Sequence, residues 1–322
     1  MRDNVIDSWK GLCVISIILI HTVFHSGASY TPAYLKNLVL LFDVPVFFFL
    51  TGCLASIKVD LDPFKQMYKL ICLFFFLTLF LELITGYTSL EHILEPLMLK
   101  DAYVKSLISV ASSYWFVPTY IICLLYLTMI TKYANKMIPK ILLFIIPIYY
   151  LYSWFSGKLI NVSTLGISSQ IILFYFWLML LGQQSYNNKK YSSKILWAMC
   201  GVTSTILLIF LWHSIPNFSL QNFKFPVKLP YCIGSMISIS TIMLIKKEIN
   251  SKILLFIGNK AIYFYLSQCI GSSLLFYIVP HLNYFWTINL IICFIINIII
   301  TLTLGYIFYQ TDKNLSAHYK HQ

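Results

Sequence analysis

Charged residues are scarce in this sequence of 322 residues. Asp, Glu, Lys and Arg make up 11% of it, whereas a soluble globular chain carries about 25%. Hydrophobic residues make up 59%, and the mean hydropathy is +0.79. A chain this apolar has too little polar surface to face water on every side. The composition therefore excludes a soluble domain.

Glycine and proline are also few, and paired cysteines are missing. Gly and Pro together number 23 against 48 for Phe and Tyr, which excludes disordered and collagen-like chains. The eight cysteines stand singly in apolar stretches, without the paired spacing of a zinc site or a redox dithiol. We interpret them as small buried hydrophobes and predict no disulfide scaffold and no metal site.

The sequence consists largely of long apolar runs. A helix crosses a bilayer with roughly 17 to 25 residues, and about ten runs reach that length. The sequence predicts an all-α fold, a polytopic membrane helix bundle forming a single transmembrane domain over residues 1–322. Asp3 and Asp7 precede the first run and no small-x-small cleavage site follows it, so we expect a retained helix rather than a signal peptide. The predicted spans are 11–29, 35–57, 64–86, 112–131, 138–156, 167–184, 193–213, 229–246, 253–279 and 284–309.

The formal charge of +12 is distributed as a topology signal. With the N-terminus in the cytoplasm, sixteen of the 23 Lys and Arg residues fall in cytoplasmic segments and six outside, and Lys260 falls within the ninth span. The positive-inside rule then predicts that both termini are cytoplasmic. No basic cluster carries interleaved exposed aromatic residues, so we expect lipids and no nucleic acid as partners. The predicted location is a multi-pass position in a plasma or inner membrane.

Polar residues on the first predicted helix are the candidates for chemistry. A charged side chain at mid-bilayer costs about 2.5 to 3.5 kcal/mol, so one that persists usually has a partner or lines a cavity. Lys10 and His21 are eleven residues apart, which places them on one helix face with His21 about 16 Å deeper. His21 is a candidate general base because its ordinary pKa suits proton transfer at neutral pH; a packed structural histidine is the alternative. His25, one turn further, is a weaker candidate.

These residues open a series of motifs. Lys10 and His21, a basic residue and a histidine separated by ten residues, resemble the opening of the acyltransferase-3 family of integral membrane O-acyltransferases. The other segments that resemble family motifs, in order along the chain, are Phe42 to Gly52, Tyr114 to Phe116, Lys224 to Pro226, Ile257 to Lys260 and Tyr265 to Gln268.

The resemblance implies a stand-alone O-acetyltransferase with acetyl-CoA as donor and no tightly bound cofactor. The acceptor it implies is a hydroxyl of a cell-surface polysaccharide or a lipid-linked glycan precursor. Lys10, Lys65, Lys69 and Lys260 are predicted to hold the anionic end of acetyl-CoA, and Asp7 to pair with Lys10 or another cytoplasmic base. Family members often have an arginine pair where Lys65 and Lys69 stand. Lysine keeps the charge but lacks the bidentate fork of arginine.

Asp43, Trp115 and Gln268 are the predicted acceptor-binding residues. Each has an alternative role: a salt bridge or helix kink for Asp43, an interfacial belt for Trp115, and a helix–helix hydrogen bond for Gln268. Gln268 stands where the family often has histidine, and an amide cannot carry a proton. His21 either acts directly as a base or forms an acyl-histidine. A transporter of a lipid-linked sugar or small solute, and a purely structural membrane subunit, remain the alternative functions.

Overall fold

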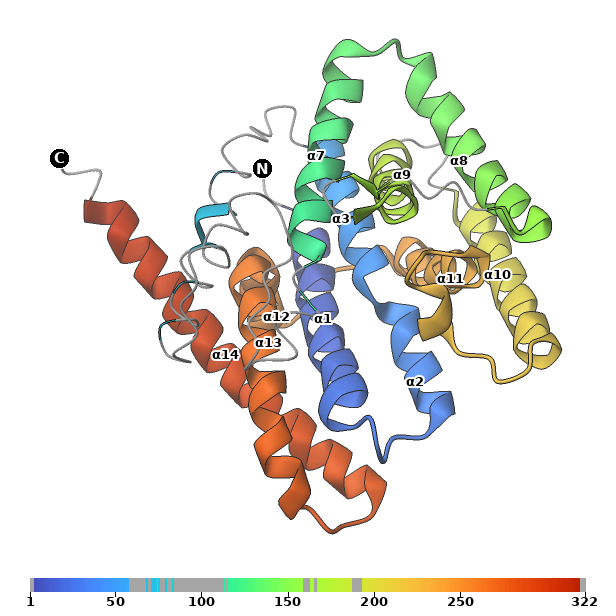
Figure 1. The fold of residues 1–322 in the computed structure, drawn as a ribbon. Coiled ribbons are helices and arrows are strands. Elements are labelled where there is room, and N and C mark those ends of the chain that lie inside the picture. The colour runs from blue at the N-terminus through green and yellow to red at the C-terminus, as the bar shows by residue number, and fades with distance from the viewer. Residues whose placement is uncertain are drawn as a thin grey trace. The chain divides into compact units, whose positions relative to one another are not determined.

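The computed structural model consists almost entirely of helices. It describes residues 3–57, 113, 115–158, 163–164, 167–186 and 193–318, with residues 68, 71–73, 75, 79 and 83. Within these ranges the strands are β1 (Ser163–Thr164) and β2 (Ile167–Ser168), which pair antiparallel. The chain divides into two compact units, one of residues 1–39, 103–113 and 248–322, the other of residues 40–102 and 114–247. The predicted all-α fold is confirmed (Figure 1).

The first unit is built around the N-terminal helix. Asp3 starts this helix, because its carboxylate accepts hydrogen bonds from the backbone N–H groups of Val5 at 2.9 Å and Ile6 at 3.2 Å. The helix packs against α12, α13 and α14. The elements of this unit are α1 (Asn4–His21), the π-helical turn η1 (Thr22–Ser26), α2 (Ala33–Val39), α12 (Lys252–Asn259), α13 (Ala261–Ile278), η5 (Val279–His281) and α14 (Trp286–His318).

Two glycines let α1 and α12 cross with their backbones in contact. A Cβ added at Gly11 would lie 2.1 Å from the carbonyl oxygen of Leu254, and one added at Gly258 would lie 1.7 Å from that of Asp7. Non-bonded atoms do not approach so closely. The close contact of the two helices therefore requires glycine at both positions. The crossing buries the stretch of α1 that carries Asp7 and Lys10, whose side chains are each only 8% exposed.

The second unit packs its helices in pairs. α3 lies against α9 and α10 against α11, while α7 and α8 also contact α9. The crossing of α3 and α9 is again closed by glycines: Gly52 abuts the backbone of Met179, and Gly182 that of Phe49. The elements are η2 (Leu40–Phe42), α3 (Val44–Ile57), α7 (Phe116–Tyr133), α8 (Met137–Ser156), α9 (Ser169–Ser185), α10 (Lys194–Ser214), η4 (Leu220–Phe223) and α11 (Leu229–Ile245), with β1 and β2.

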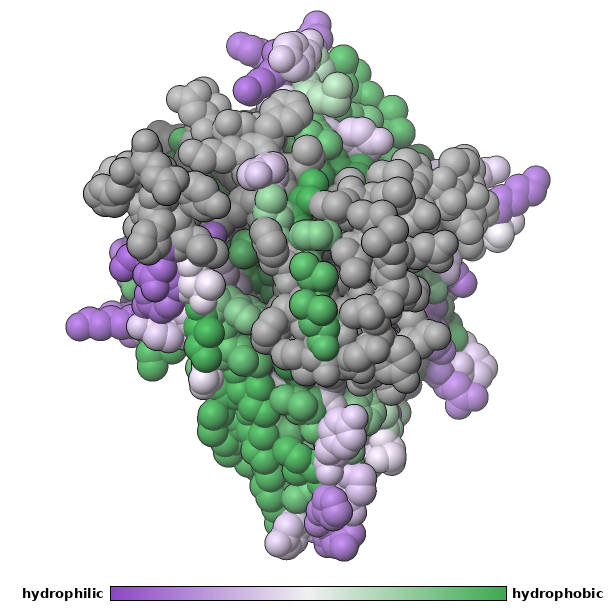
Figure 2. All heavy atoms as spheres, turned by 60° about the vertical axis from the view of Figure 1, so that its left-hand side comes forward, coloured by the Kyte–Doolittle hydropathy of each residue, from purple (hydrophilic) through white to green (hydrophobic). Residues whose placement is uncertain are grey.

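Several helices present apolar side chains outward. On α14, isoleucines 288, 291, 295 and 299 recur every three or four residues, so they share one helix face, and each is 47–59% exposed. Figure 2 shows an extended apolar surface on the side where Figure 1 draws α14. In the part of the chain that the structure describes, seven helical stretches are long and apolar enough to cross a bilayer: Asn4–Ser26, Ala33–Ile57, Phe116–Tyr133, Met137–Ser156, Lys194–Ser214, Ala261–His281 and Trp286–Asn314. The chain is a helical membrane bundle.

The helices differ from the predicted spans in several places. Predicted span 35–57 is divided into α2, η2 and α3, and the last helix continues to His318 rather than ending at residue 309. The first helix begins at Asn4 rather than residue 11, because Asp7 and Lys10 are buried against other helices and need not face lipid. The ninth predicted span, 253–279, is two helices that meet at Lys260, whose non-helical backbone ends α12. Predicted span 64–86 lies largely outside the described residues. Ten crossings and two cytoplasmic termini stay predictions.

Candidate active site

His21 is the last residue of α1, and its ring contacts a second histidine. His21 Nδ1 lies 3.1 Å from His25 Nε2. The two rings are stacked, with centroids 5.1 Å apart and planes inclined by 13°. The edge of Phe276 in α13 packs on the other side of His25 at 6.3 Å. Because α1 is continuous from Asn4 to His21, Lys10 and His21 do share one helix.

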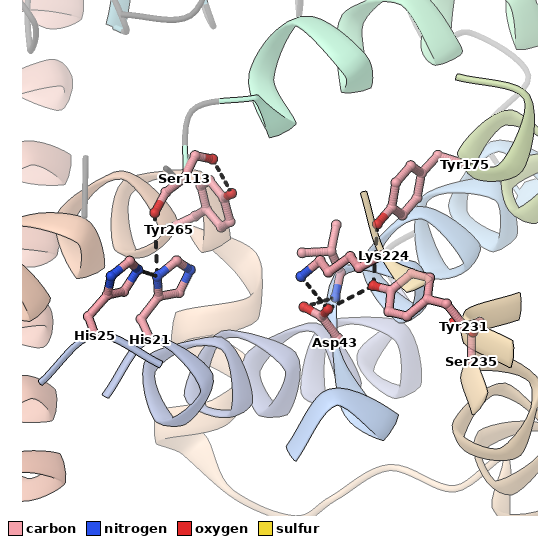
Figure 3. A network of polar contacts seen from close by, with 10 residues as sticks. His21, His25, Asp43, Ser113, Tyr175, Lys224, Tyr231, Ser235 and Tyr265 are labelled. Atoms are coloured by element: carbon pink, nitrogen blue, oxygen red, sulfur yellow. Dashed lines mark hydrogen bonds and ion pairs between the residues drawn. The ribbon is translucent and has the colours of Figure 1, made fainter. Parts of the chain in front are cut away.

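Ser113 is the third member of this cluster. Its hydroxyl oxygen lies 3.4 Å from His21 Nδ1, and its carbonyl oxygen accepts a hydrogen bond from the hydroxyl of Tyr265 at 2.9 Å. Tyr265 is fully buried in α13. The tyrosine therefore fixes Ser113, and with it the polar surroundings of His21 Nδ1 (Figure 3).

The contacts at Nδ1 determine what the other nitrogen of His21 can do. A neutral imidazole carries hydrogen on one nitrogen only. When His21 carries it on Nδ1, this N–H donates to His25 Nε2, and His21 Nε2 holds the lone pair that can accept a proton. Once Nε2 is protonated, His25 continues to accept from Nδ1–H and stabilises the imidazolium. The pair has the geometry of a base with an orienting partner.

A buried ion pair forms a polar cluster in the second unit. Lys224 Nζ lies 2.5 Å from Asp43 Oδ2, and the hydroxyl of Tyr231 donates to the same oxygen at 2.7 Å. The other carboxylate oxygen accepts from the backbone N–H of Val44 at 2.7 Å, at the start of α3. The hydroxyls of Tyr231 and Tyr175 are 3.4 Å apart. Three donors therefore contact the carboxylate, namely the Lys224 ammonium, the Tyr231 hydroxyl and the Val44 N–H, and Tyr175 contacts it only through Tyr231 (Figure 3).

Aromatic rings surround the ammonium of this pair. Lys224 Nζ is 5.8 Å from the ring centroid of Trp115, 5.5 Å from that of Phe225 and 5.9 Å from that of Tyr231, distances typical of cation–π contacts. Trp115 also packs on Phe225 at 5.0 Å and on Tyr175 at 5.5 Å. Trp115 is half-buried and Phe225 is 41% exposed. Two predicted acceptor residues, Asp43 and Trp115, therefore meet around Lys224.

Gln268 lies on α13, where its side chain is buried and only partly hydrogen-bonded to the described residues. Its side chain is fully buried. Its amide nitrogen donates to the Sγ of Cys269 at 3.3 Å, while its carbonyl oxygen has no hydrogen-bond partner in the part of the chain that the structure describes. Tyr265, which holds Ser113, lies one turn before it. A buried carbonyl without a donor is unfavourable by about 1 to 3 kcal/mol, so a substrate donor would be favoured there.

The predicted donor-binding residues are spread along the first unit. Lys10 and Asp7 lie buried on α1. Lys260 lies at the break between α12 and α13, with its ammonium 4.3 Å from the ring centroid of Tyr309. Lys65 and Lys69 lie outside the described residues. Among the residues that are described, no three His, Cys, Asp or Glu side chains gather as a metal site, and none of the eight cysteines forms a disulfide.

Three participants in these clusters are poorly marked or unmarked in the sequence. His25 is only a weaker candidate there, because helical spacing alone does not show that its ring touches that of His21. Ser113 had no signal, since it approaches His21 from 92 positions away. Lys224 was placed only within a motif, although a buried carboxylate such as Asp43 implies a cationic partner elsewhere in the chain. A search for that partner among the lysines that lie between predicted spans would have included Lys224, which falls between 193–213 and 229–246.

Comparison with known proteins agrees with the motifs. A family model described as an acyltransferase domain, that of the acyltransferase-3 family, matches residues 3–310. Neither a search of curated proteins nor a search of solved structures gives a significant match. The match spans nearly the whole chain, from the capping Asp3 through both polar clusters to α14. The chain belongs to the acyltransferase-3 family and is a membrane acyltransferase.

Proposed function

We propose that this protein is an O-acetyltransferase that uses cytoplasmic acetyl-CoA. The acceptor is a hydroxyl of a cell-surface polysaccharide or of its lipid-linked precursor. His21 is the general base of the reaction. The observation that carries the proposal is the contact between His21 Nδ1 and His25 Nε2 at 3.1 Å, which orients one imidazole for proton transfer.

The reaction needs a single proton carrier. His21 Nε2 removes the proton of the acceptor hydroxyl as its oxygen attacks the thioester carbonyl carbon. The new ester C–O bond forms and the C–S bond breaks. The CoA thiolate then receives the proton from the imidazolium, which returns His21 to its neutral form. General-base catalysis of this kind contributes roughly 10²- to 10⁴-fold. An acyl-histidine route, in which Nε2 itself attacks the thioester, uses the same residue.

Donor binding is assigned to the basic residues of the first unit and of the third predicted span. Lys10 lies on the same helix as His21, about 16 Å away along the helix axis. The long neutral arm of acetyl-CoA can cover such a distance while its phosphates stay near the membrane surface. Lys260, Lys65 and Lys69 are the other cations assigned to the phosphates. Asp7, one turn from Lys10, is assigned to orient it.

Acceptor binding is assigned to Trp115, Asp43 and Gln268. The exposed part of the Trp115 and Phe225 rings offers an apolar platform of the kind on which sugar rings stack. Asp43 holds Lys224 beside that platform. The carbonyl oxygen of Gln268 supplies a hydrogen-bond acceptor for a substrate hydroxyl or amide.

The test uses the purified chain with labelled acetyl-CoA and a panel of surface glycans. Wild type should transfer label to one glycan class, and His21→Ala should lose roughly 10²- to 10⁴-fold in rate. His213, an exposed histidine near the end of α10, supplies the matched control: His213→Ala should transfer label at the wild-type rate. Activity of His21→Ala near that of wild type would remove His21 from the mechanism.

A further inference from the structure

The helix that carries His21 changes its winding at this residue. Residues Thr22–Ser26 form a π-helical turn, in which the N–H of Gly27 donates to the carbonyl of Thr22, five residues earlier, at 2.7 Å. The hydroxyl of Ser26 donates to the same carbonyl at 3.0 Å. A Cβ on Gly27 would lie 2.9 Å from that oxygen, so the turn closes on a glycine. His25 is inside this turn, and the turn therefore sets where its ring meets His21.

One side chain from the last helix holds the turn. The Nδ2 of Asn297, in α14, lies 3.0 Å from the hydroxyl oxygen of Thr22 and 3.5 Å from the carbonyl oxygen of Ile18. The Thr22 hydroxyl itself donates to the Ile18 carbonyl at 2.8 Å. Asn297 is thus hydrogen-bonded to the chain at the point where α1 ends and the π-helical turn begins.

Both polar atoms of the Asn297 side chain have hydrogen-bond partners. Its Nδ2 also donates to the hydroxyl of Ser272 in α13 at 3.0 Å, and its Oδ1 accepts from Thr301 at 3.2 Å. A Cβ at Gly271 would lie 2.3 Å from that Oδ1, so the glycine makes room for the amide. Asn297 is fully buried. Three helices of the first unit therefore converge on one amide.

A residue that only filled space at position 297 would be apolar, because an amide is unfavourable in an apolar interior. Asn297 interrupts a run of isoleucines, Ile295, Ile296 and Ile298, in the most apolar stretch of the chain. Burying an amide there is compensated only by hydrogen bonds. One of its bonds goes to Thr22, in the turn that carries His25, and a longer one goes to Ile18 in the last turn of α1.

We propose that Asn297 is a positioning residue for acyl transfer. Its hydrogen bond to Thr22 fixes the π-helical turn, and the turn holds His25 Nε2 against His21 Nδ1. The inference rests on the proposed function, in which His21 is the base. It adds a residue on the last helix, more than 270 positions away in sequence, to the machinery that orients that base.

The experiment compares two asparagines of the same helix. Asn297→Leu should lower kcat on the order of tenfold, because a misplaced base slows transfer, and should leave the KM for acetyl-CoA unchanged. Asn289 is also buried in α14, and among the described residues its side chain bonds to Leu282 and Tyr284 of the preceding loop and not to α1. Asn289→Leu should therefore leave kcat at the wild-type value. Thr22→Val, which removes the same contact from the other side, should match Asn297→Leu.

A double variant separates positioning from folding. If Asn297 acts through His25, Asn297→Leu should reduce kcat no further in a His25→Phe background. Independent, multiplicative losses would overturn the inference, as would equal losses in Asn297→Leu and Asn289→Leu.

A measurement without substrates keeps this inference apart from the proposed function. The rate at which diethyl pyrocarbonate modifies His21, followed by peptide mass spectrometry in detergent, should change in Asn297→Leu and not in Asn289→Leu. An unchanged rate would overturn the positioning role whatever the acyl donor is. Failure of the proposed function would show instead as full activity of His21→Ala, or as no transfer from acetyl-CoA by wild type.

Discussion

At the scale of single residues, the pairing of His21 with His25 has a direct kinetic consequence. His25→Phe keeps a ring that can stack on His21 but removes the nitrogen that accepts from Nδ1–H. We expect kcat to fall roughly 10- to 100-fold, the scale seen when a residue that orients a reacting group is lost. His25→Gln restores an acceptor and should recover part of the loss. Equal rates for wild type and His25→Phe, measured with labelled acetyl-CoA, would show that the contact is only packing.

The ion pair of Asp43 and Lys224 makes a prediction about stability. Both side chains are buried, so removing one partner leaves an uncompensated charge, which destabilises a fold by about 3 to 5 kcal/mol. Asp43→Asn and Lys224→Met should each lower the unfolding temperature in detergent strongly. The double variant removes both charges and should be more stable than either single variant. Additive losses in this double-mutant cycle would mean that the two groups do not interact.

At the scale of helices, the crossing of α1 and α12 depends on Gly258. Gly258→Ala places a methyl group 1.7 Å from the carbonyl oxygen of Asp7, so the helices must move apart. Overpacking of this kind destabilises by about 1 to 3 kcal/mol. Gly234 in α11 is the matched control, because a Cβ there meets side-chain carbons at 3.4 Å or more, an ordinary contact. We expect thermal unfolding to show a clear loss for Gly258→Ala and little change for Gly234→Ala.

The sequence predicted the helices well because lipid imposes a simple rule. A run of about 20 apolar residues is a helix wherever it faces hydrocarbon, and the predicted spans 138–156, 193–213 and 229–246 agree with helices to within two residues. The rule failed where side chains face protein. The start of α1 was placed seven residues late, because hydropathy treats the buried Asp7 and Lys10 as exposed to lipid.

The candidate site was predictable only where spacing along one helix sufficed. Lys10 and His21 share α1, so their relation follows from 3.6 residues per turn. The contacts of His21 with Ser113 and of Asp43 with Lys224 join residues 92 and 181 positions apart. No local pattern encodes such contacts, since they depend on how helices pack. The π-helical turn is similarly invisible in the sequence, because it is held by Asn297 from the far end of the chain.

At the scale of the whole molecule, the proposed reaction has to bring two substrates to one base within the membrane. The charge asymmetry predicts cytoplasmic termini, and the depth of His21 along α1 predicts a base near the middle of a hydrocarbon layer about 30 Å thick. Acetyl-CoA is polyanionic, and burying unpaired charge in hydrocarbon costs many kcal/mol. We therefore expect the proposed donor to stay on its own side while the acetyl group alone moves to the acceptor.

Sealed vesicles that carry only this protein distinguish two routes for the acceptor. With labelled acetyl-CoA on the side of the chain termini and glycan only on the opposite side, we expect labelled glycan to form, because a base at mid-depth can be reached from both faces. Orientation is read by protease access to the C-terminus. If label appears only when both substrates share the compartment of the termini, the acceptor enters from the cytoplasm and the two-sided route is wrong. His21→Ala vesicles identify any label that crosses by leakage, because we expect this variant to transfer acetyl groups roughly 10²- to 10⁴-fold more slowly from either side.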